Sequence, residues 1–147
     1  MYNRKHDQRS NRTIAQSLVE FTLMLPILLV LVVSAIEFGR VFYTQIVITN
    51  AAREGAYYLS THASDGSAAA NTQLAAENEA NNSGISSITV EIAPPSGWDP
   101  GDNIKITVET TVNDLLILGF LGNVFSITST NYDQFPLNSS VEMMVQP

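Results

Sequence analysis

The chain has 147 residues, of which 45% are hydrophobic, and it contains no cysteine. This length leaves room for one modest domain and an anchor. The missing cysteine excludes disulfides, thiol catalysis, an acylated lipoprotein cysteine and thiolate-bound metal. Residues 1–15 carry a net charge of +3, whereas residues 41–147 carry two basic and eleven acidic residues, a net charge of −9. The acidic part argues against nucleic acid or anionic lipid as its main partner.

A long apolar run follows the basic residues 1–15. From Leu18 to Phe38 the chain has 21 residues, and only Glu20 and Glu37 are charged. A helix needs about 20 residues to cross the hydrocarbon core, whereas a cleaved secretory signal has an apolar stretch of roughly 7–15 residues. We therefore predict a retained transmembrane helix over residues 16–40. The basic residues before it place the N-terminus in the cytoplasm and the C-terminal part outside.

Two residues inside this run are unusual for a spanning helix. Pro26 deprives the Thr22 carbonyl of its helical partner, so we expect a kink or a locally melted turn there. Glu20 is the second, because a carboxylate at mid-membrane costs roughly 2.5–3.5 kcal/mol. It lies near the cytoplasmic end, so it either reaches water or has a partner outside its own helix.

The outer end of the run has the residues of an interfacial anchor. Glu37 and Arg40 are three positions apart, so they can pair on one face of a helix. Phe38, Phe42 and Tyr43 predict an aromatic belt at the same level. The simplest interpretation of all five residues is anchoring at the outer membrane interface.

The start of the apolar run resembles a type IV prepilin processing site. The sequence is Ala15-Gln16-Ser17-Leu18-Val19-Glu20-Phe21. In that pattern a short basic leader is cut after a small residue, usually Gly, and a Glu-aromatic pair follows at mature positions five and six. The resemblance implies cleavage between Ala15 and Gln16 by a prepilin peptidase. It also implies that Glu20, followed by Phe21, meets the free α-amino group of a neighbouring subunit, so that each buried charge offsets the other.

Four sequence blocks in order resemble TadE-like proteins, the minor pilin-like components of the Tad (tight adherence, Flp pilus) machinery. The blocks are Gln16 to Phe21, Leu25-Pro26, Ile36 to Arg40, and Asn50 to Ala56. The resemblance implies a single-pass protein of the bacterial inner membrane that can be incorporated in a pilus and whose partners are pilin-like subunits and pilus assembly proteins. The rival interpretation is an uncleaved, signal-anchored extracytoplasmic module for binding or adhesion.

Helix-forming residues continue beyond the membrane, so we predict one helix from Gln16 to Leu59, with residues 41–59 as an extracytoplasmic stalk. Its outer half is amphipathic. Small residues at helical spacing would let another backbone approach closely; they are Ala51, Ala52, Gly55 and Ala56. They either pack against the protein's own domain or contact another subunit.

Residues 60–147 predict a small α+β domain. Residues 67–80 form either a weak helix, capped by Ser67 and ended before Gly84, or a mobile surface segment. Alternation of apolar and polar residues then predicts a four-stranded antiparallel sheet packed on the stalk helix; its strands are residues 85–92, 104–112, 125–130 and 141–145. The apolar stretch from Leu115 to Leu121 is either a buried loop or an exposed surface for a partner protein or the outer leaflet.

Nothing in the sequence predicts an enzyme. The two histidines, His6 and His62, form no cluster with metal-ligand spacing, and there is no phosphate-binding glycine loop. Asp99 and Asp102 could suggest calcium, but a turn containing Pro and Gly explains them better. We therefore expect no catalytic residue, cofactor or metal.

Overall fold

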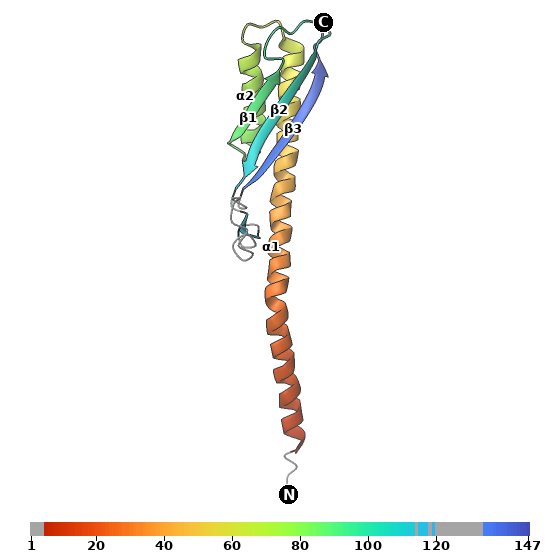
Figure 1. Cartoon of the computed structure of the whole chain (residues 1–147), viewed down its shortest axis with the longest axis vertical. Coiled ribbons are helices and arrows are strands. Elements are labelled where there is room, and N and C mark those ends of the chain that lie inside the picture. Colours follow the sequence, from red (N-terminus) through yellow and green to blue (C-terminus); the bar gives the residue numbers. More distant parts are fainter. Residues whose placement is uncertain (1–4, 114, 118, 120–133) are drawn as a thin grey trace.

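The computed structural model describes residues 5–113, 115–117, 119 and 134–147. One very long helix carries a small domain at its C-terminal end, so that the start of the helix and the C-terminus of the chain lie at opposite ends of the rod (Figure 1). The elements in chain order are α1 (Lys5–His62), α2 (Ala68–Asn82), β1 (Ile88–Ala93), β2 (Asn103–Val112) and β3 (Phe135–Met144). The predicted α+β fold, with a long N-terminal helix and a small antiparallel sheet, is confirmed.

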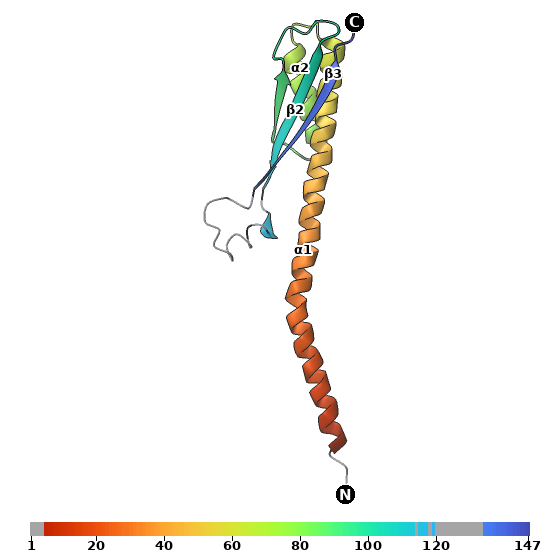
Figure 2. The same cartoon turned by 45° about the vertical axis from the view of Figure 1, so that its right-hand side comes forward.

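Helix α1 has 58 residues, which at 1.5 Å per residue makes it about 87 Å long. It is longer at both ends than the predicted helix from Gln16 to Leu59. At its C-terminal end, the N–H of Asp65 donates to the carbonyl of His62 (3.0 Å) in a turn. We expected a kink or a locally melted turn near Thr22–Pro26. The helix continues through Pro26, so the melted turn is wrong, whereas α1 as a whole curves gently (Figure 2).

The sheet has the order β1-β2-β3, and both pairs are antiparallel. Among the described residues it has three strands; the predicted strand 125–130 lies outside them. Strand β3 begins at Phe135, earlier than the predicted start at Val141. The polar residues before Val141 hid this start. Among the described strands β3 pairs with β2 alone, and a strand at a sheet edge tolerates proline and polar residues.

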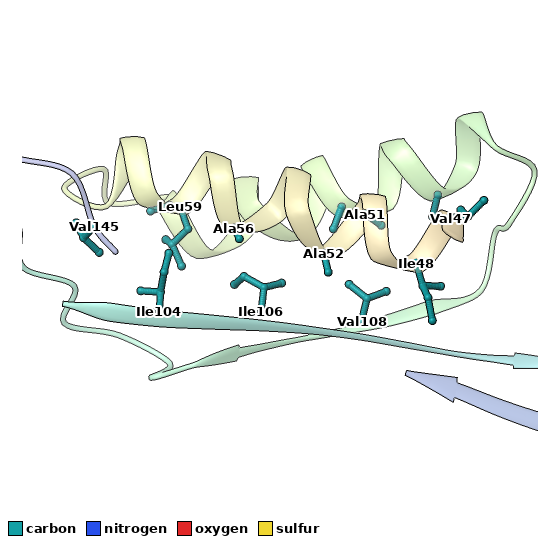
Figure 3. Packing of buried hydrophobic residues seen from close by; sticks show 13 residues of the cluster. Val47, Ile48, Ala51, Ala52, Ala56, Leu59, Ile104, Ile106, Val108 and Val145 are labelled. Carbon is teal, nitrogen blue, oxygen red and sulfur yellow. The ribbon is translucent and has the colours of Figure 1, made fainter. Parts of the chain in front are cut away.

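The core lies between the sheet and the outer half of α1. Side chains from α1 point toward those of β2 (Figure 3). The fully buried apolar residues include Ile48, Ala51, Ala52, Ala56 and Leu59 of α1 and Ile104, Ile106 and Val108 of β2. The stalk helix is thus one layer of the domain's own core, as predicted from the small size of the domain.

Helix α2 forms as a packed helix, so the alternative of a mobile surface segment is wrong. Its buried residues are Ala68, Thr72, Ala76 and Ala80. Ser67 occupies the N-cap position, but its side chain makes no capping hydrogen bond. At the other end Gly84 has φ +81°, and the N–H groups of Gly84 and Ile85 donate to the carbonyls of Asn81 and Ala80 (both 2.9 Å). This is the glycine-terminated helix end that the sequence predicted.

Candidate functional site

Within the described part of the chain, the apolar part of α1 is not buried against the protein. The helix segment Ala15–His62 contains a stretch long and apolar enough to cross a membrane, and none of that stretch is buried. Phe21, Leu23 and Leu31, for example, are 64%, 67% and 65% exposed. Exposed apolar surface of this extent is costly in water, whereas a bilayer solvates it and the helix satisfies its own backbone. This surface fits membrane anchoring.

The residues of the predicted processing site lie at the start of this stretch. Ala15, Gln16 and Glu20 are all exposed on α1. The side-chain amide of Gln16 donates to Oε1 of Glu20 at 3.2 Å, because residues four apart face each other on a helix. The carboxylate of Glu20 and the neighbouring ring of Phe21 are therefore both accessible from outside the chain.

At the C-terminal end of the apolar stretch, the structure does not bring Glu37 and Arg40 together as a pair. Glu37 is only 8% exposed, and its Oε1 accepts the backbone N–H of Ile117 at 2.9 Å. The Arg40 guanidinium donates to the carbonyl of Asn113 at 3.3 Å. Both side chains thus bind backbone groups of residues that follow β2. Phe38, the residue after Glu37 along α1, is 65% exposed.

Glu37 caps a short helical turn from a distance. The carbonyl of Leu115 accepts the N–H of Gly119 (2.9 Å), which closes this turn. The first N–H groups of a helical turn have no partner within it, and a leucine at the start cannot supply one. Because Oε1 of Glu37 accepts the N–H of Ile117, α1 provides the oxygen that a Ser or Asp at the N-cap would normally provide.

Beside this turn lies an apolar hollow of about 440 Å³. It is lined by Ser34, Glu37, Phe38, Val41, Leu115, Ile117 and Phe135. Leu115 is 2% exposed, whereas Leu116 is 70% exposed. The predicted apolar connection from Leu115 to Leu121 therefore has one buried and one exposed leucine where it is described; residues 118, 120 and 121 lie outside the described part.

Three further polar contacts tie α1 to the domain above this level. The hydroxyl of Tyr43 donates to the carbonyl of Ser83 (3.0 Å), and the side-chain amide of Gln45 donates to the carbonyl of Asn138 (3.1 Å). The hydroxyls of Thr49 and Ser139 are 3.0 Å apart in a hydrogen bond. Sequence reasoning missed all three, because each joins residues at least 40 positions apart. Together they fix the domain against the stalk.

The small-residue patch is buried inside the protein. Ala51, Ala52 and Ala56 are 0% exposed, and a Cβ on Gly55 would lie 3.4 Å from Cβ of Ala76 and from Cγ2 of Ile106. Of the two interpretations given above, these residues follow the first, because they let α1, α2 and β2 meet. They are not available to another subunit.

Asp99 and Asp102 lie in a hydrogen-bonded turn, which was the simpler of the two interpretations given above. The N–H of Asp99 donates to Oδ2 of Asp102 (3.0 Å), and the N–H of Asp102 donates back to the carbonyl of Asp99 (3.0 Å). Gly101, with φ +96°, completes the turn. In the described part of the chain, no three acidic or histidine side chains are grouped so as to hold a metal ion.

The cap provided by Glu37 gives a direct prediction. A Glu37→Leu variant leaves the N–H of Ile117 without its acceptor, which costs about 1–3 kcal/mol, so hydrogen exchange at this amide should be about tenfold faster or more. Glu37→Gln retains an oxygen acceptor and should exchange much like the parent chain. NMR-detected exchange of the full chain in micelles measures both. An unchanged rate in Glu37→Leu contradicts the capping role.

Comparison with known proteins agrees with the resemblance found in the sequence. Residues 15–56 match the family described as TadE-like protein. The match begins at the predicted processing site and ends within the buried small-residue patch, so it covers the span and the stalk but not the sheet. No curated protein and no solved structure matches the chain.

Proposed function

Because the chain carries a TadE-like segment over residues 15–56, we propose that it is a pilin-like structural component of a Tad/Flp-type pilus assembly or secretion machine. It is anchored in the inner membrane by α1 as a single span, with the C-terminal domain on the outer side. A prepilin peptidase removes residues 1–15. The observation that carries this proposal is the exposed apolar stretch of α1, which lies within the segment that matches the family.

Charge supports the orientation. The basic residues precede the apolar stretch, and the acidic residues gather in the domain at the far end of α1 (Figure 1). Positive charge stays on the cytoplasmic side of a span. The domain is therefore extracytoplasmic.

The fold supports a structural role. The same helix serves as anchor and as one layer of the domain core, so force on the domain passes directly to the span. At the other end, Glu20 is exposed near the N-terminal end of the apolar stretch. There its carboxylate can meet the α-amino group of a second pilin-like subunit, which cleavage before Gln16 would create.

The mass and N-terminal sequence of the protein isolated from its native membrane test this proposal. We expect a chain that begins at Gln16 and lacks the fifteen leader residues. An Ala15→Gly variant should be cut as well, because it keeps a small residue before the cut, whereas Ala15→Phe should retain the leader. A native chain that retains Met1 contradicts processing and favours the uncleaved binding or adhesion module.

A further inference from the structure

The turn that follows β2 lies beside the membrane-spanning part of α1, below the sheet (Figures 1 and 2). Two contacts fix its height. The N–H of Ile117 donates to Glu37 at 2.9 Å, and Leu115 lines the same hollow as Ser34 and Phe38. The turn therefore lies level with residues 34–41 of α1.

This level is the outer boundary of the membrane, an inference that rests on the proposed function. The apolar run from Leu18 to Phe38, at 1.5 Å per residue, is about 32 Å long, close to the roughly 30 Å of the hydrocarbon core. Glu37 then lies at the end of the run. Ser34, three residues before it, lies about 4.5 Å deeper. The turn that follows β2 thus lies beside the last membrane-embedded turn of α1, within the outer leaflet.

The chemistry of the turn suits this depth. Leu116 is 70% exposed, and its two neighbours Leu115 and Ile117 line the hollow together with Phe38, which is 65% exposed. Exposed apolar side chains thus stand both on the turn and on α1 at this level. The N–H groups of Ile117 and Gly119 are both satisfied within the protein, as an apolar environment requires. The outward face of the sheet is different, since Glu91, Lys105, Glu109 and Glu142 are exposed there.

We propose that Leu116 and the turn that carries it insert into the outer leaflet of the bilayer that α1 spans, as a second membrane contact. A single spanning helix is free to rotate about its axis and to tilt. The second contact, held to α1 by Glu37, restricts both motions and sets the direction in which the domain faces along the membrane surface.

The experiment uses the full chain, whose lack of cysteine permits single labelling sites. Leu116→Cys is labelled with an environment-sensitive fluorophore and reconstituted in phosphatidylcholine vesicles that contain lipids brominated near the headgroup. Phe38→Cys reports the boundary, Leu28→Cys the middle of the span and Leu74→Cys the aqueous side. Leu116 is exposed, so its replacement leaves the core intact.

We expect brominated lipid to quench the probe at position 116 as strongly as the probe at position 38. Aqueous iodide should quench both probes weakly. The quenching by lipid should be the same at all protein-to-lipid ratios. The proposal is overturned if iodide quenches the probe at 116 as strongly as the probe at 74. If deeply brominated lipid still quenches the probe at 28 in that case, the span itself is intact. Protection that grows with the protein-to-lipid ratio also overturns it, because a second copy then covers Leu116. A probe at 28 that lipid does not quench overturns the span and this proposal together.

Discussion

The Gly55→Leu variant is expected to lose its folded outer domain and to keep its membrane span. A Cβ at this position already lies 3.4 Å from Cβ of Ala76 and from Cγ2 of Ile106, and 3.5 Å from the carbonyl oxygen of Thr72. Leucine adds three carbon atoms beyond that Cβ, at the point where α1, α2 and β2 meet. Such overpacking costs about 1–3 kcal/mol or more. A small domain without disulfides has little stability to lose.

Gly55→Ala is the matched control. Its Cβ makes contacts at the close end of the usual range, and alanine favours a helix interior over glycine by about 0.8–1.0 kcal/mol, so the net change should be small. Urea unfolding of the full chain in micelles measures both variants. The fluorescence of Trp98, the single tryptophan, reports the transition, because its side chain packs against the core. Equal midpoints for Leu and Ala contradict tight packing at this point.

The parts of the fold that follow from local patterns could be predicted from the sequence. The apolar run from Leu18 to Phe38 predicted a long apolar helix, which α1 contains, because the length and composition of such a run are read from neighbouring residues alone. Ile104, Ile106 and Val108 alternate with polar residues, and they are buried on one face of β2 as this alternation requires. Gly84 marked the end of α2 for the same reason, since its positive φ is a property of one position.

The parts that depend on distant residues could not be predicted. Glu37 and Arg40 suggested a local ion pair, yet each has a partner more than 70 residues further along the chain. The small-residue patch fitted two kinds of neighbour, because a close-approach surface does not specify what approaches it. Only the fold places α2 and β2 there. The same limit held for β3, whose first residues include Pro136 and the polar run from Asn138 to Ser140 and which pairs there because β2 lies beside it.

Replacement of Glu20 by alanine should abolish assembly with other pilin-like subunits without affecting membrane insertion. If the Glu20 carboxylate meets the α-amino group of a neighbour inside the bilayer, its loss leaves a buried positive charge unpaired. Breaking one partner of a buried pair costs about 3–5 kcal/mol, which weakens association roughly a hundredfold or more. Insertion should improve slightly, since alanine is less costly in the bilayer than a carboxylate.

The measurement is crosslinking or co-purification with the pilus components in native membranes, compared with the amount of the variant that resists carbonate extraction. Leu23→Ala, which truncates a side chain that is 67% exposed, controls for a general change in the span. Glu20→Gln separates charge from shape: it retains an oxygen that accepts a hydrogen bond from Gln16 as Oε1 of Glu20 does, but it cannot neutralise an ammonium group. If charge pairing is the cause, Glu20→Gln fails to assemble like Glu20→Ala. Normal assembly of Glu20→Ala contradicts the pairing role, and rescue by Glu20→Gln assigns the effect to hydrogen bonding instead.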